Sequence, residues 1–247
     1  GVSAMIQDLF SDHFALFILC PNGQHETHMN CDKFIPNPKH TSPLAMAQIE
    51  FVGKLMAMSL RAKLMLPFDF PSIVWKILGG ETPDLSDLQS VDAITCSLLK
   101  ALRTCEDDGI FDQESFAAKY KTKLMWTYNG SDGVERELYK GSSTRVVTYE
   151  TKNEYCDQVE RARLHEFDDH MEAMCRGFSA VIPERILRLF SWDQLETLVA
   201  GSPTVDIALW KQQTNSSVSP KVLELFWKVM ESLTPKEQSA FIRFAWG

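Results

Sequence analysis

Helix-start signals recur in the first and last thirds of this 247-residue chain, and they constrain its fold more than any other feature. Ser42-Pro43 joins a capping serine to a proline at the first helical position, and Ser219-Pro220 repeats that arrangement. Ser191 and Gln194 form a capping box. Residues 234–237 combine a cap, a first-position proline and a capping-box glutamate. These signals predict helices toward both ends of the chain.

The first zone, residues 1–80, is expected to combine one strand with two helices. The apolar run from Phe14 to Leu19 predicts a buried strand, and Pro21-Asn22-Gly23 supplies turn chemistry after it. Apolar residues at helical spacing predict a helix after Pro43, and they are Ile49, Val52, Leu55, Met56 and Leu60. A shorter helix over 71–78 is expected to stop at Gly79-Gly80.

The middle zone, residues 81–158, is more polar. A helix from Asp92 to Cys105 is predicted by the spacing of Ile94, Leu98, Leu99 and Leu102. Candidate strands follow at 124–128, 135–139 and 145–149, and residues 129–133 suit a hairpin connection between the first two. The predicted fold class is α+β and predominantly helical. A large helical subdomain (1–80 and 159–247) would carry this zone as an inserted small α+β subdomain.

Composition limits the classes of partner and the compartment. A formal net charge of −8 with mixed signs argues against nucleic acid or an anionic membrane as the main partner. The apolar run from Phe14 to Cys20 is too short to span a membrane. Six cysteines without paired spacing favour free thiols in a reducing compartment, so we expect a cytoplasmic protein, with the nucleus as the alternative.

Cys20, His25, His28 and Cys31 place two thiols and two imidazoles within twelve residues, which could surround a zinc ion. Their order matches no common zinc-finger spacing, and Cys20 ends an apolar strand, where a buried thiol behaves as a small hydrophobe. The structural interpretation is therefore preferred. No metal site is predicted, and no cofactor is expected because the chain has no glycine-rich phosphate loop.

His165-Glu166 with His170 resembles a zinc-protease helix, but that motif needs its histidines four residues apart. Five residues turn a helix by about 500°, so the two side chains diverge by roughly 140°. The sequence instead favours a charged, solvated helix face. Residues 177–181 lack the second glycine of a serine-hydrolase nucleophile elbow.

The cysteines of the middle and last zones are expected to be structural. Cys96, Cys105 and Cys175 have no histidine beside them in sequence to act as a base. Leu98-Leu99 has two interpretations, since Trp126 and Tyr128 fall on a nearby predicted strand. These apolar residues either form the small core of the middle zone or line an exposed groove for a partner loop.

Seven runs along the chain occur in order and with plausible spacing: 51–61, 66–79, 84–88, 178–183, 189–196, 199–206, and 226–231 continued by 241–247. Together they resemble the amino-terminal lobe of HECT-type ubiquitin ligases, and most of all that of the large HERC-like members. The resemblance covers nearly the whole chain. It implies a bilobed ligase whose inserted subdomain docks a ubiquitin-charged conjugating enzyme. The other lobe would hold a cysteine that accepts ubiquitin as a thioester and passes it to a substrate lysine.

The family's contact positions carry over to seven residues of this chain, and Leu99 is expected to be accessible to solvent on the groove face. They are Thr95, Leu98, Leu99, Cys105, Leu124, Trp126 and Tyr155. Thr95 is smaller and more polar than the usual aliphatic residue, and Cys105 replaces an aromatic residue of some members.

The family's nucleophile lies in a Thr-Cys-Phe setting. Thr95-Cys96 continues to Ser97 and Thr104-Cys105 continues to Glu106, so neither matches. The resemblance therefore places the nucleophile beyond Gly247 and implies a chain that binds but does not catalyse. Its partners would be a conjugating enzyme, ubiquitin, and protein substrates held by regions outside this chain. A non-catalytic interaction module of the same fold and a self-contained cysteine hydrolase are the alternatives.

Overall fold

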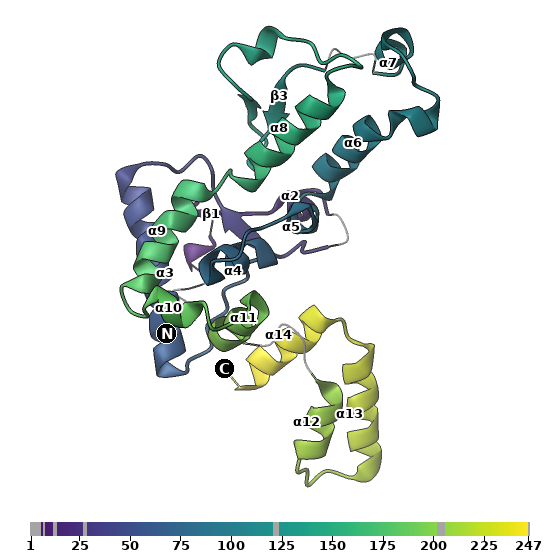
Figure 1. Ribbon diagram of the computed structural model, residues 1–247. Helices are drawn as coiled ribbons and strands as arrows, with labels where there is room; N and C mark the ends of the chain where they lie inside the picture. The colour runs from purple at the N-terminus through teal and green to yellow at the C-terminus, as the bar shows by residue number, and fades with distance from the viewer. Residues whose placement is uncertain are drawn as a thin grey trace.

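The computed structural model describes residues 6, 8–11, 14–26, 29–120, 124–201 and 206–246, which are mostly helical with two small antiparallel sheets (Figure 1). The predicted α+β, predominantly helical fold is confirmed. The helices are α2 (Pro21–Gln24), α3 (Pro43–Ala62), α4 (Ser72–Gly79), α5 (Leu85–Val91), α6 (Ala93–Arg103), α7 (Gln113–Lys119), α8 (Lys152–Leu164), α9 (Asp168–Ser179), α10 (Glu184–Leu187), α11 (Trp192–Ala200), α12 (Ile207–Gln213), α13 (Pro220–Ser232) and α14 (Pro235–Trp246), with 3-10 turns η1 (Cys105–Asp108) and η2 (Ser142–Thr144). The strands are β1 (Phe17–Leu19), β2 (Phe34–Pro36), β3 (Thr127–Asn129) and β4 (Glu135–Glu137).

The predicted helix starts are confirmed. The Ser42 hydroxyl accepts a hydrogen bond from the Ala45 amide at 3.2 Å and starts α3. The Thr234 amide donates to the Glu237 carboxylate at 2.8 Å at the start of α14. Each cap satisfies amide groups that have no partner within the helix, and this explains why such local signals predict boundaries well.

The strand expected over 14–19 is shorter than predicted, because Ala15 has a φ of 47° and so interrupts the extended backbone. β1 begins at Phe17 and pairs antiparallel with β2. The residues predicted to form a turn, Pro21-Asn22-Gly23, instead open the single helical turn α2. Proline is favoured at the first position of a helix as well as in turns, so the sequence signal fits both.

The middle zone holds fewer strands and more helices than expected. β3 and β4 form the predicted hairpin, whereas the strand expected over 145–149 is reduced to one bridge between Met125 and Val146. That prediction of a third strand was wrong. The short helices α5 and α7 were not predicted, and both begin with an aspartate cap, at Asp84 and Asp112.

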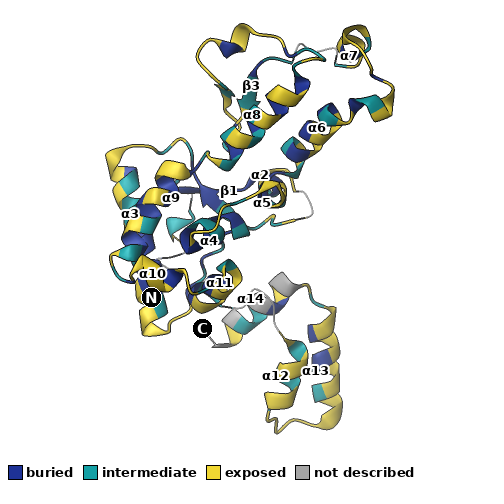
Figure 2. Cartoon of the chain, viewed as in Figure 1, coloured by how far each residue is buried: buried dark blue, intermediate teal, exposed yellow. Residues whose placement is uncertain are grey.

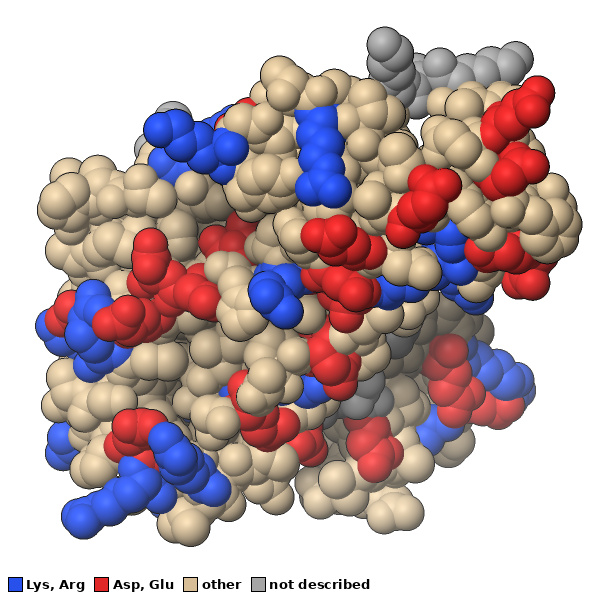
Figure 3. Space-filling view, turned by 45° about the horizontal axis from the view of Figure 1, so that its top comes forward, with Lys and Arg blue, Asp and Glu red and all other residues tan. Residues whose placement is uncertain are grey.

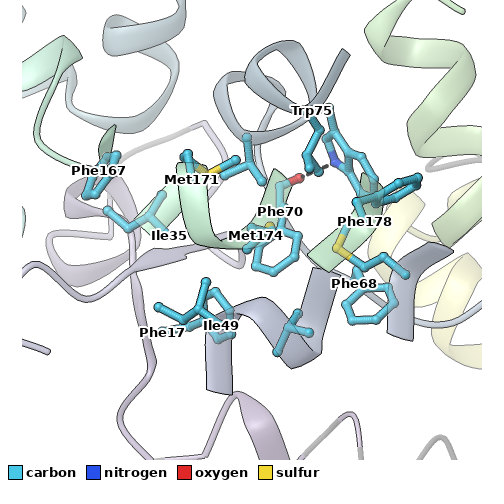
Figure 4. Close-up of a cluster of buried hydrophobic side chains, with 14 of the residues drawn as sticks. Phe17, Ile35, Ile49, Phe68, Phe70, Trp75, Phe167, Met171, Met174 and Phe178 are labelled. Carbon is cyan, nitrogen blue, oxygen red and sulfur yellow. Dashed lines mark hydrogen bonds between the residues drawn. The ribbon is translucent and has the colours of Figure 1, made fainter. Parts of the chain in front are cut away.

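A large aromatic core organises the first part of the molecule (Figure 4). It draws its buried side chains from residues 6–96 and 167–199. The Phe17 and Phe70 rings have centroids 5.0 Å apart, and the Trp75 indole donates to the Phe70 carbonyl at 3.2 Å. This bond satisfies the one polar group of a fully buried indole. We call the elements around this core, up to residue 201 and without α6–α8, the large unit.

Two glycines bring α3 and α9 unusually close inside the large unit. A Cβ atom at Gly53 would lie 2.1 Å from the Met174 carbonyl oxygen, and one at Gly177 would lie 1.8 Å from the Glu50 carbonyl oxygen. Both obstacles are backbone atoms, which cannot rotate away. The crossing of these two helices therefore depends on the absence of side chains at both positions.

A second, separate core lies among α6, α7, the β3–β4 hairpin and α8, and we call these elements the small unit (residues 93–164). On α6 the two cores meet, because Cys96 belongs to the first and Leu99 to the second. Figure 1 shows α6 and α8 side by side, projecting from the large unit. The division into subdomains stays a prediction, and the cores favour a border within α6 rather than at Gly80.

The described side chains of α12, α13 and α14 belong to neither core. Trp210 on α12 packs edge-on against Trp227 on α13, with centroids 5.2 Å apart, and Phe226 lies beside both. Much of the surface of α13 is exposed (Figure 2). Among the described residues, no helix has the length and apolar character needed to cross a membrane.

The close helix crossing yields the first test. We expect Gly53→Ala to lower the free energy of unfolding by about 2–3 kcal/mol, since its methyl group would overlap backbone that cannot move. The matched control is Gly79→Ala, where the nearest atom is a leucine side-chain methyl at 3.3 Å. Urea denaturation should show the control within about 1 kcal/mol of wild type. Equal effects of the two substitutions would contradict the role given to the crossing.

Candidate protein-docking groove

A groove opens between α6, α8 and the segment that leads into β3, with a pocket volume of about 240 Å³. The residues that line it come from both helices and from the hairpin, and they are Thr95, Leu98, Leu99, Leu124, Met125, Thr127, Tyr128, Asn129, Glu135, Tyr155 and Val159. The lining is apolar at its centre, and Glu135 carries the only acidic side chain among these lining residues.

Five of the seven residues implied by the family resemblance meet in this groove: Thr95, Leu98, Leu99, Leu124 and Tyr155. Leu98 is 42% exposed, whereas Thr95 and Leu124 are half-buried. Leu99 and Tyr155 are 1% and 3% exposed. The groove thus has an accessible leucine above a sealed floor.

Three expectations about these seven residues need correction. Leu99 was expected to be accessible to solvent, but it packs into the second core. Cys105 and Trp126 are fully buried in that same core and do not line the groove. Arg145 covers the Trp126 ring at 4.0 Å, and Tyr155 packs against it edge-on at 5.9 Å. The two alternatives for the apolar residues therefore both hold in part, with Leu98 facing outward and Trp126 inward.

The sequence prediction also missed part of the lining. The resemblance placed Leu124 and Trp126 toward the partner on the strand predicted over 124–128, but regular strand begins only at Thr127. The segment 124–126 is irregular, so alternation fails there and Met125 reaches the groove. Val159 lies one helical turn beyond Tyr155 on α8, and this spacing was the signal that could have found it.

Tyr155 fixes the floor of the groove to the hairpin. Its hydroxyl donates to the Thr127 carbonyl at 2.9 Å, which ties α8 to β3. Burial raises the pKa of Tyr155 to about 12, with the nearby Cys156 thiol as a smaller cause. The phenol is therefore neutral at physiological pH and acts as a hydrogen-bond donor within the structure.

The chemistry of the five cysteines other than Cys31, four of them buried and Cys175 half-buried, opposes nucleophilic catalysis. Burial raises the pKa of Cys96, Cys156 and Cys175 to about 11, and it also raises the pKa of Cys20 and Cys105. A nucleophilic cysteine needs the opposite shift, because the thiolate is the reactive form. The five residues behave as packing groups, and Cys31 is the exposed thiol.

The described candidates for metal ligands, Cys20, His25 and Cys31, do not form a metal-binding group. His28 lies outside the described residues, and Cys20 is buried with its sulfur 3.2 Å from the Asn30 carbonyl. Within the described ranges, no group of three His, Cys, Asp or Glu residues is arranged to hold an ion. His165 is exposed beside Asp168, whereas His170 is buried, so these histidines do diverge.

The solvated helix face expected around these histidines is wrong for Glu166. Its side chain is 3% exposed, and it accepts hydrogen bonds from the Ser131 amide at 3.0 Å and hydroxyl at 2.7 Å. His170 is also buried, and desolvation lowers its pKa. Charged residues are exposed to solvent on average, but a charged side chain that finds hydrogen-bond or ion-pair partners in the interior can be buried.

Comparisons with known proteins show the family of this chain. The family model described as HECT-domain (ubiquitin-transferase) matches residues 3–247. The E3 ubiquitin-protein ligase HERC2 of Mus musculus is 31% identical over 250 residues, which cover 100% of this chain and 5% of that protein. TOM1 of Saccharomyces cerevisiae (strain ATCC 204508 / S288c) is 25% identical, covering 98% of this chain and 7% of the ligase. HACE1 of Danio rerio is 25% identical, covering 97% of this chain and 26% of that ligase.

The chain therefore belongs to the HECT-domain family of ubiquitin transferases. The similarity to HERC2 confirms the predicted resemblance to the HERC-like members of the family. The chain spans about one-twentieth of the length of those HERC2 relatives.

Adjacent leucines give a direct test of the groove. We expect Leu99→Asp to lower the free energy of unfolding of the small unit by about 3–5 kcal/mol, because it places an unpaired charge in a core. Leu98→Asp should cost only about 0.5 kcal/mol, since that side chain is exposed. Urea denaturation followed by tryptophan fluorescence measures both. Cooperative, wild-type-like unfolding of Leu99→Asp would show that the groove floor is misplaced.

Thiol reactivity tests the burial of the cysteines. At pH 8 a thiol with a pKa of about 11 is ionised in roughly one molecule per thousand. We expect the native chain to show one fast-reacting thiol, Cys31, with Ellman's reagent, and Cys31→Ser to remove it. A fast phase that persists in Cys31→Ser would point to an activated cysteine and favour the hydrolase alternative.

Proposed function

We propose that this chain is the conjugating-enzyme-binding lobe of a HECT ubiquitin ligase, with the groove between α6 and α8 as its docking surface. The observation that carries the proposal is the convergence of Thr95, Leu98, Leu124 and the Tyr155 floor in one pocket. These residues come from three separate segments of the chain. An accessible leucine over a rigid apolar floor suits the insertion of an apolar or aromatic side chain from a partner loop.

The groove is open at its rim and sealed at its base, which suits a partner that binds and leaves repeatedly. Leu98 supplies exposed apolar surface, while Leu99 and Tyr155 give the floor its fixed shape. The neighbouring Ile94 is 50% exposed on the same helix, one turn before Leu98, and extends the apolar surface. A loop that seats on α6 would therefore bury Leu98 first.

In the whole protein, we propose, a cysteine outside these residues accepts ubiquitin from the bound conjugating enzyme as a thioester and transfers it to a lysine of a substrate. The raised pKa of Cys20, Cys96, Cys105, Cys156 and Cys175 supports a nucleophile elsewhere. Ubiquitin and protein substrates would then be partners of the complete ligase, with the substrates recognised outside this chain.

A protein of the reducing interior of the cell fits the cysteine chemistry. None of the six cysteines forms a disulfide, although Cys31 is exposed. On the face drawn in Figure 3, lysine and arginine are interspersed with aspartate and glutamate, and no broad basic surface of the kind that nucleic acid selects stands out there. We propose a cytoplasmic ligase whose partners are proteins.

Binding to a panel of ubiquitin-charged conjugating enzymes tests the proposal. We expect the wild-type chain to bind at least one of them, and Leu98→Asp to weaken that binding by at least tenfold. Truncating a central apolar contact costs about 2 kcal/mol or more, and a charge adds desolvation. The measurement is biolayer interferometry or calorimetry at fixed salt.

The matched control is Leu189→Asp, which changes another exposed leucine, 77% exposed and outside the groove. It should leave the affinity unchanged. Absence of binding by the wild-type chain across the panel would refute the proposal. Equal weakening by both substitutions would place the docking surface elsewhere.

A further inference from the structure

The chain crosses between the large and small units twice, and buried charges occupy both crossings. Asp92 stands at the first crossing, between α5 and α6. The second crossing holds Arg163, in the last turn of α8, and Glu166, between α8 and α9. Their side chains are 5%, 1% and 3% exposed. We call these three residues together with Ser131 of the hairpin loop the neck.

Arg163 connects every part of the neck. One Nη atom lies 3.1 Å from the Asp92 carboxylate and donates to the Ser131 hydroxyl at 2.9 Å. The other donates to the Asn129 carbonyl at 2.7 Å, and Nε lies 3.4 Å from Glu166. A single guanidinium therefore links the start of α6, the hairpin and the end of α8. Its planar fork allows these contacts in one orientation only.

Residues of α2 in the large unit also hydrogen-bond to the hairpin and to the start of α6. The Gln24 amide of α2 donates to the Ser131 carbonyl at 2.8 Å, and the Asn22 side chain accepts from the Ala93 amide at 2.8 Å. At Gly130 a Cβ atom would lie 2.5 Å from the Glu166 carboxylate, so the hairpin backbone packs directly against that carboxylate. The large unit thus grips the hairpin and the first residue of α6 at the same place.

Stability alone does not explain such a network. Apolar residues of similar volume often stabilise a fold as well as a buried ion pair does, because burying charge costs solvation. Directional hydrogen bonds differ from apolar contacts in that they specify one geometry. The two hydrophobic cores are separate, and Cys96 is the residue of α6 that packs into the first of them, so directional polar contacts carry much of the restraint on the angle between the units.

We propose that Arg163 is a positioning residue that fixes the angle between the small and large units, and with it the direction in which the groove presents a bound conjugating enzyme. The second half of this statement rests on the proposed function. The first half concerns this chain alone and is tested without any partner.

The test uses a variant that removes the neck charges together: Arg163→Met, Asp92→Asn and Glu166→Gln. No buried charge is left unpaired, and asparagine at position 92 preserves the cap on the Thr95 amide. Spin labels at Ala62 on α3 and Ala118 on α7, both exposed, report the distance between the units. Cys31→Ser in every protein prevents labelling of the exposed native thiol.

We expect double electron–electron resonance to give one narrow distance distribution for the labelled wild type, and at least a twofold broader one for the neck variant. Arg103→Met is the matched control, because Arg103 pairs with Asp157 and Glu160 inside the small unit. Its distribution should stay narrow. A narrow, unshifted distribution for a folded neck variant would overturn the proposal.

If the neck variant does not unfold cooperatively, Arg163→Lys replaces it. Lysine keeps the positive charge but lacks the planar guanidinium. Broadening is again expected, and an unchanged distribution again overturns the proposal. Circular dichroism and a urea transition establish that each protein compared is folded.

The functional half has its own measurements. The neck variant should bind a conjugating enzyme with wild-type affinity within twofold, since none of the three substituted side chains lines the groove. Single-turnover transfer of ubiquitin to the full-length ligase, at saturating conjugating enzyme, should fall at least tenfold. An unchanged transfer rate in a variant with broadened distances would refute the positioning role. Failure of the wild-type chain to bind any conjugating enzyme would refute the proposed function, while the distances would still decide whether the neck sets the angle.

Discussion

The contact between α3 and α9 across Gly53 and Gly177 is the constraint on which the rest of the arrangement depends. It lets two backbones approach to a distance that no side chain would permit, and the aromatic core closes around the pair. Because α9 follows α8 after only three residues, the position of α9 also fixes where α8 ends. The helix that carries Tyr155 and Val159 therefore ends at a point that a crossing in the large unit places.

Much of the helical framework could be predicted from the sequence, and the reason is local. A cap such as Ser42 or Thr234 satisfies amides within its own first turn, so a few neighbouring residues decide the boundary. The strand expected over 145–149 depended on distant pairing instead. Its β-forming residues find one bridge partner at Met125, and tertiary context overrides propensity there.

In the groove, too, the sequence could predict which positions matter but not which of them are buried. Family resemblance supplied the positions, and five of the seven meet in the pocket. Whether a residue faces the partner or the core is a tertiary property, decided for Trp126 by the side chains that cover it, Arg145 and Tyr155. Glu166 shows the limit most clearly. Its burial depends on Ser131 and Arg163, and Ser131 stands 35 residues away, which no sequence window includes.

The size of the groove explains why orientation matters as much as attachment. An aromatic side chain buries about 150–250 Å², which at about 25 cal/mol per Å² gives roughly 4–6 kcal/mol before any costs. Association costs of at least about 4 kcal/mol then leave a weak complex. Under the proposed function, a partner held so weakly would dwell only briefly, and productive transfer would require that it already point the right way when it binds. The rigidity proposed for Arg163 would then supply what the contact area at Leu98 does not.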